Sequence, residues 1–68
     1  MNKNKLVARL TFQGETHDIY LGKVGRFYGL FVEGERLEDT ELRATENDAI
    51  NELLENYSVP GVYEVVFF

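Results

Sequence analysis

One stretch of the chain, residues 45–57, carries the spacing of an amphipathic helix, and it is short. Thr45 is a suitable N-cap, and Asp48 three residues later approximates a capping box. Apolar residues then recur at helical spacing, at Ala49, Ile50, Leu53, Leu54 and Tyr57. Pro60 ends the pattern, because proline cannot continue the hydrogen-bond ladder. A helix of about three turns covers only one face of a sheet, and this limits how the 68 residues can fold as a single domain.

Two segments that alternate between apolar and polar residues predict a β-hairpin ahead of the helix. Over residues 5–12, one side carries Leu6, Ala8, Leu10 and Phe12, and the other carries Lys5, Val7, Arg9 and Thr11. Over residues 16–24, Ile19 and Leu21 lie opposite Asp18 and Tyr20. A period of two is typical of half-buried strands, and Gly14 lies in the expected turn.

Two apolar runs predict further strands. Residues 26–33 are apolar on both faces, with Phe27 and Phe31 on one and Tyr28, Leu30 and Val32 on the other. Such a strand is expected to be central, or to meet a partner with one face. Residues 62–68 are apolar on both faces apart from Glu64, whereas residues 36–44 are charged enough to predict a loop or a short edge strand. The predicted fold is α+β, an antiparallel meander of three to four strands with one helix packed on one face and a C-terminal strand, in the order β-β-β-α-β.

The sheet face away from the helix is expected to present apolar side chains. The candidates are Val7, Tyr20, Phe27, Phe31, Val62, Val66 and Phe68. Contiguous apolar surface of this kind usually marks a contact. The simplest contact is a two-fold homodimer, with Phe27, Phe31, Val62, Val66 and Phe68 as the self-association residues. The alternative is a sheet that curls enough to bury these residues itself.

Charge is divided unevenly along the chain. Residues 1–32 hold five basic and two acidic residues, a net charge of +3. Residues 33–68 hold two basic and ten acidic residues, a net charge of −8, which brings the total to −5. A negative protein has no general affinity for nucleic acid or for anionic membranes. The acidic half therefore favours a protein partner with a basic surface, or serves solubility alone.

The acidic residues concentrate in two places. Asp48, Glu52 and Glu55 share one side of the predicted helix, which carries no lysine or arginine to pair with them. A second cluster precedes the helix and would extend the first if it lay alongside: Glu33, Glu35, Glu38, Asp39 and Glu41. Carboxylates about 5–6 Å apart along a helix approach the charge density of nucleic-acid phosphates, so such a surface can compete for a basic groove. A solvated helix face on an acidic protein is the alternative.

The sequence offers little to catalysis, to metals or to cofactors. It holds one histidine, His17, one serine, Ser58, and no cysteine, and the two lie in unrelated segments, so no nucleophilic triad is predicted. Residues 33–41 lack the ligand pattern of an EF-hand loop. The run 26–32 departs from the aromatic strand pattern of RNA-recognition domains. We therefore expect a non-enzymatic protein with no catalytic residue, no metal site and no cofactor.

The N-terminal residues do not have the pattern of a signal peptide. Residues 1–5 are polar and basic, but Arg9 interrupts the apolar run that a signal peptide requires. No segment approaches the roughly 20 apolar residues that span a bilayer, and the lack of cysteine fits a reducing compartment. We expect a cytoplasmic protein that does not bind membranes.

In size, acidity and strand-dominated layout, with Asp48, Glu52 and Glu55 on one helix, the chain resembles the small acidic inhibitors that phages encode against host defence. These include anti-CRISPR proteins and DNA mimics. The resemblance implies a stoichiometric inhibitor, acting in the host cytoplasm, that blocks a basic nucleic-acid-binding protein such as a CRISPR effector without binding nucleic acid itself. A second hypothesis is a homo-oligomeric structural or assembly protein that associates through its apolar sheet face. A third is an antitoxin-like module that neutralises a basic toxin.

Overall fold

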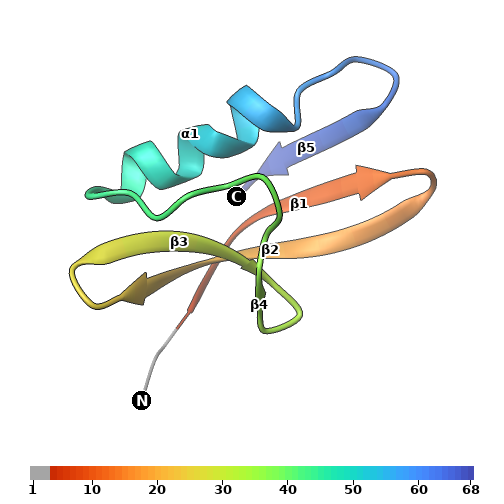
Figure 1. Ribbon diagram of the computed structural model, residues 1–68. Coiled ribbons are helices and arrows are strands. Elements are labelled where there is room, and N and C mark those ends of the chain that lie inside the picture. Colours follow the sequence, from red (N-terminus) through yellow and green to blue (C-terminus); the bar gives the residue numbers. More distant parts are fainter. Residues whose placement is uncertain (1–3) are drawn as a thin grey trace.

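In the computed structural model, which describes residues 4–68, the chain forms one antiparallel sheet of five strands and one helix (Figure 1). The elements follow the order β1 (Lys5–Phe12), β2 (Glu15–Val24), β3 (Phe27–Val32), β4 (Glu35–Arg36), α1 (Glu46–Asn56) and β5 (Tyr63–Phe67). The first three residues of the polar N-terminal segment lie outside the described residues. The predicted α+β meander is confirmed. The additional edge strand, β4, covers Glu35 and Arg36, so it overlaps the predicted loop or edge segment 36–44 only at Arg36.

The strand order across the sheet is β4-β3-β2-β1-β5. Each of the first three strands pairs with the next, and the connection through α1 returns β5 to the free side of β1. The β1–β2 and β3–β4 connections each place two consecutive residues at positive φ, at Gln13 and Gly14 and at Glu33 and Gly34. This is the conformation of a type I′ turn, whose twist matches that of the strands it joins.

One residue breaks the predicted alternation in β1. The register with β2 shifts between Leu6 and Ala8, so Val7 is an extra residue and the strand contains a β-bulge. Val7 is buried at 6% exposure and Leu6 is 39% exposed, the reverse of the sides predicted from a strict period of two. The prediction of sides was wrong here, because an inserted residue changes the face of every residue before it.

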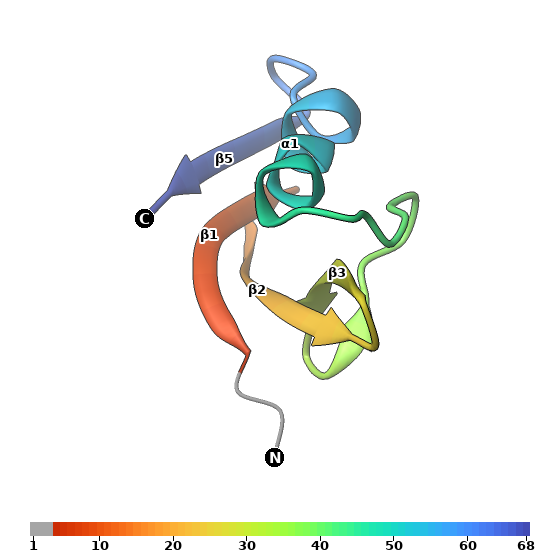
Figure 2. The same cartoon turned by 90° about the vertical axis from the view of Figure 1, so that its left-hand side faces the viewer.

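The helix packs on one face of a strongly curved sheet (Figure 2). The core between them is formed by Val7, Ala8, Leu10, Ile19, Leu21, Leu30, Leu37, Ala49, Leu53 and Tyr57. The Thr45 hydroxyl accepts a hydrogen bond of 3.1 Å from the Asp48 backbone N–H, which confirms the predicted N-cap. Leu54 is 52% exposed, because it follows Leu53 by about 100° around the helix and leaves the covered stripe. Within residues 4–68, no helix has the length and apolarity needed to cross a membrane.

Candidate functional site

The acidic segment between β4 and α1 folds back alongside the helix. The Tyr57 hydroxyl donates a hydrogen bond of 2.6 Å to the Glu38 carbonyl oxygen, and Asn56 Nδ2 donates one of 2.9 Å to the Asp39 carbonyl oxygen. Within the segment, the Thr40 hydroxyl donates to the Leu37 carbonyl oxygen at 2.6 Å. These bonds use backbone carbonyl groups, so they hold the segment in place and leave its carboxylates free. The loop acids Glu38 and Asp39 therefore lie beside the C-terminal end of α1.

Glu52 is the exception among the acidic candidates. It is 3% exposed, and its Oε1 accepts a hydrogen bond of 2.7 Å from Arg43 Nε. Its Oε2 accepts a second bond of 2.8 Å from Asn56 Nδ2. The expectation that the three helix acids share an unpaired solvent-facing side is wrong for Glu52, because an arginine outside the helix reaches it. Glu52 is a buried structural carboxylate.

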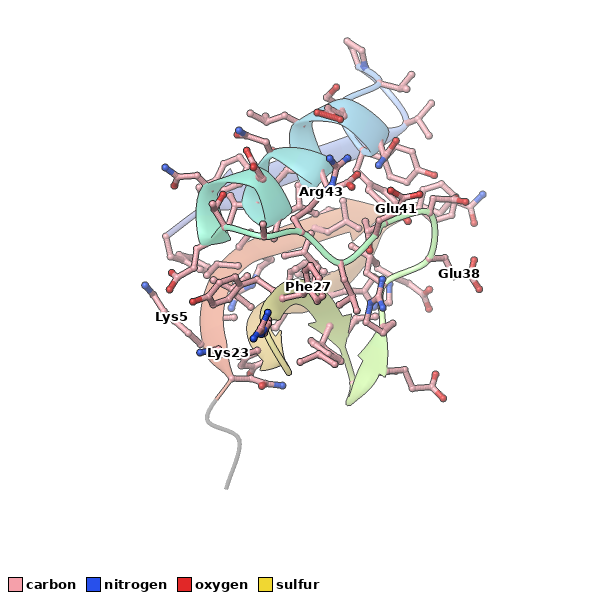
Figure 3. The ribbon with its side chains drawn as sticks, turned by 60° about the vertical axis from the view of Figure 1, so that its left-hand side comes forward. Lys5, Lys23, Phe27, Glu38, Glu41 and Arg43 are labelled. Carbon is pink, nitrogen blue, oxygen red and sulfur yellow. The ribbon has the colours of Figure 1, made fainter. Side chains whose placement is uncertain are left out.

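Arg43 marks the point where the loop and helix acids approach each other. Its hydrogen bond and charge pairing with Glu52 raise the pKa of the guanidinium, and the nearby carboxylates of Glu55 and Glu41 act in the same direction. Figure 3 shows Arg43 between the helix and the loop, with Glu41 and Glu38 along the loop. Residues from both predicted clusters thus act on one side chain.

Tyr57, at the other end of the contact between loop and helix, also lies near acidic residues of the loop. Burial raises the pKa of its phenol, and the negative charges of Asp39 and Glu38 add to this rise. The ring lies at the C-terminal end of α1 and is 8% exposed. The loop acids are therefore within electrostatic range of the helix terminus.

Seven predicted acidic candidates remain exposed, and together they define what we call the acidic surface: Glu33, Glu35, Glu38, Asp39, Glu41, Asp48 and Glu55. In the part of the chain that the structure describes, the ion pairs within 4 Å are Arg9–Asp18 and Arg43–Glu52, so none of these seven carboxylates is paired. The basic side chains of Lys5 and Lys23 lie on another part of the molecule, at the lower left of Figure 3. Both lysines line a pocket with Glu46 of the first turn of α1, so they lie away from the loop acids Glu38 and Glu41 but near the N-terminal end of the helix.

A groove of about 440 Å³ opens between the β3–β4 turn and the C-terminal end of α1. Its aromatic lining comes from three separate segments, with Phe12, Tyr57 and Tyr63 in contact. The Phe12 and Tyr63 rings stack with centroids 4.9 Å apart, and Tyr57 meets Tyr63 edge-on at 5.0 Å. Four residues of the acidic surface also line the groove: Glu33, Glu35, Glu38 and Asp39. Sequence reasoning missed this groove, because no local pattern brings the three aromatic residues together.

The predicted self-association residues fall into two separate groups. Phe27 and Phe31 lie on β3, whereas Val62, Val66 and Phe68 lie in or beside β5. Between the groups, on the same sheet face, β1 and β2 carry the Arg9–Asp18 ion pair at 3.0 Å, and Arg9 is the register partner of Val66. The sheet curls enough to half-bury Phe31, while Phe27 stays 47% and Phe68 66% exposed. These residues do not form the continuous apolar face that the pattern predicted.

Comparison of the chain with protein-family models, with curated proteins and with solved structures finds no match. Among residues 4–68, no three His, Asp or Glu side chains are placed to hold a metal ion together. The acidic surface and the groove within it are the features from which a function can be argued.

Proposed function

We propose that this protein is a non-catalytic inhibitor that binds a basic nucleic-acid-binding protein through its acidic surface and blocks it. One observation carries the proposal. Seven carboxylates, none of them in an ion pair among the described residues, are exposed on the β3–β4 turn, on β4, on the loop and on α1, and the loop is hydrogen-bonded to the C-terminal end of α1. A host-defence effector of the CRISPR type is the partner that the resemblance to phage inhibitors suggests. The site of action is then the host cytoplasm.

The arrangement of these acids costs stability, which favours a role in binding. Neighbouring carboxylates repel each other, and Glu55 lies near the C-terminal end of α1, where the helix dipole disfavours a negative charge. The last turn of the helix carries no basic residue to offset this. A basic partner relieves the repulsion on association, because its lysine and arginine side chains neutralise the same carboxylates.

Fixed geometry is the second support. The backbone of Glu38 and Asp39 is held by Tyr57 and Asn56, so a partner meets these two carboxylates on an ordered segment. Binding to a preorganised surface loses less conformational entropy than binding to a flexible acidic tail. Nucleic-acid-binding grooves recognise the phosphate backbone largely through charge, so a fixed array of carboxylates can occupy the same groove.

The test is a pull-down from bacterial lysate with two charge-reversed variants. Glu38→Lys/Glu41→Lys reverses two charges of the acidic surface, and Glu15→Lys/Glu64→Lys reverses two exposed acids elsewhere, so both variants change net charge equally. We expect wild type and the second variant to capture the same basic nucleic-acid-binding protein, and the first variant to lose it. Capture that is equal for both variants contradicts the proposal, because net charge alone would then explain binding.

Self-assembly is a second candidate function, favoured by the exposed residues around β5. This strand is the outermost of its side of the sheet, and Val66, Phe67 and Phe68 are 51%, 41% and 66% exposed. Sedimentation of Val66→Lys against Val24→Lys, which alters another exposed valine, tests it. A mass above the monomer that only Val66→Lys reduces would support assembly, and a monomeric wild type would exclude it.

A further inference from the structure

We propose that the groove beside the C-terminal end of α1 receives an arginine side chain of the basic partner. This inference rests on the proposed function and assigns a point of entry on the acidic surface. The groove differs from the rest of that surface in having an aromatic lining beneath its carboxylates. Both the aromatic lining and the carboxylates favour a guanidinium group.

The aromatic lining supplies a flat site for a cation. Phe12 and Tyr63 are register partners on β1 and β5, and both side chains are half-buried, so their stacked rings keep part of their surface open. Tyr57 fixes Tyr63 from the side by edge contact, and its hydroxyl is occupied by the Glu38 carbonyl oxygen. A cation placed over such a ring is attracted by its negative face.

The charged lining adds the complementary electrostatics. Four carboxylates line the groove against one guanidinium, that of Arg36, whose Nη2 already donates to the Thr40 carbonyl oxygen at 2.9 Å. His17 also lines the groove. The excess of carboxylates repels phosphate and attracts a cationic side chain. A protein segment, and not a nucleic acid, is therefore the occupant.

Arginine fits this combination better than lysine. The planar guanidinium stacks on aromatic rings and presents five N–H donors in a fixed fork, whereas the lysine ammonium is a strongly hydrated point charge. A guanidinium against the aromatic lining can also donate its N–H groups to carboxylates of the groove. Glu35 and Glu38, which flank Arg36 and Leu37 in the sequence, are two of these carboxylates.

The experiment compares fluorescein-labelled hexa-arginine and hexa-lysine by fluorescence anisotropy at low salt. The two peptides carry equal charge, so a preference reports on the guanidinium. We expect hexa-arginine to bind about two- to fivefold more tightly, the range of an exposed cation–aromatic contact. Tyr63→Leu should abolish this preference while leaving hexa-lysine binding within about twofold of wild type.

A second pair of variants keeps the test decisive if Tyr63→Leu unfolds. Glu38→Gln removes one charge inside the groove, and Glu55→Gln removes one outside it, both at exposed positions. We expect Glu38→Gln to lower the preference for hexa-arginine and Glu55→Gln to leave it unchanged. Equal binding of the two peptides overturns the groove assignment and leaves the acidic surface standing. Binding of neither peptide overturns the proposed function, and the groove assignment with it.

Discussion

The hydroxyl of Tyr57 connects the acidic loop to the helix, and Tyr57→Phe removes that connection alone. The ring stays in the core, where it is 8% exposed, so packing is retained. The change deletes the 2.6 Å hydrogen bond to the Glu38 carbonyl oxygen. Because Glu38 is exposed, water can satisfy the freed carbonyl group, and the loss stays within the net value of one hydrogen bond.

That value is about 1 kcal/mol of unfolding free energy. For a domain of this size it corresponds to a fall in melting temperature of about 4–8 °C. We expect thermal denaturation followed by circular dichroism to show this fall. Amide hydrogen exchange of residues 38–41 should accelerate in the same variant, because the loop loses one of its attachments to α1.

Alkaline pH provides an independent readout of the same contact. Burial and the neighbouring carboxylates of Asp39 and Glu38 raise the pKa of the Tyr57 phenol in the folded chain. The folded state therefore holds this proton more tightly than the unfolded state. The resulting stabilisation is complete below the unfolded value of about 10 and is lost as pH rises through the higher folded value. Unfolding free energy should fall more steeply above about pH 10 in wild type than in Tyr57→Phe.

Tyr63→Phe is the matched control, since the Tyr63 hydroxyl makes no hydrogen bond among the described residues. It should melt close to wild type. The reasoning fails if Tyr57→Phe melts no lower than Tyr63→Phe, or if exchange of residues 38–41 is the same in both. The acidic loop would then be held by contacts other than this hydroxyl.

Three further substitutions and one control variant test the account. Glu52→Ala removes the buried acceptor of two hydrogen bonds and should lower the free energy of unfolding, measured by urea denaturation, by about 1–3 kcal/mol. The control Glu55→Ala should change it by no more than about 0.5 kcal/mol. Equal effects of the two variants would show that Glu52 is not structural. Glu33→Asn should raise the free energy of unfolding by about 0.5–1 kcal/mol, because Glu33 has a φ of 51° that asparagine tolerates better. The same variant should weaken hexa-arginine binding, because it removes one carboxylate from the groove. A loss of stability would contradict the first expectation. Gly29→Ala should cost no more than about 1 kcal/mol on thermal denaturation, since the added Cβ would lie 2.8 Å from Leu42 Cδ2, the end of a side chain that can shift, and a larger loss would contradict this.

Sequence periodicity predicted the elements that are determined by residues close together in the chain. The helix begins at its predicted cap, Thr45, because the capping hydrogen bond joins residues three positions apart. The hairpins follow from alternation and from turn residues that are adjacent in the chain. The bulge at Val7 escaped prediction because it depends on how β1 pairs with β2 and leaves no mark on residue type.

The candidate surface was predicted only in part, because its geometry is tertiary. Glu52 was assigned to the exposed acids since its partner, Arg43, lies nine residues away and outside the helix. Arg43 is held beside the helix by a backbone bridge to Tyr28, which sequence spacing does not encode. The residue types could locate negative charge along the chain. They could not show which carboxylates a neighbouring side chain neutralises.

Competition with nucleic acid tests the central claim most directly. The measurement follows, by fluorescence anisotropy, the labelled nucleic acid bound to a captured basic partner while this protein is added. We predict complete displacement at about one equivalent, with Glu38→Lys/Glu41→Lys inactive and Glu15→Lys/Glu64→Lys as active as wild type. Simultaneous binding of nucleic acid and this protein to the partner would contradict the account, because the acidic surface would then bind somewhere other than the basic groove.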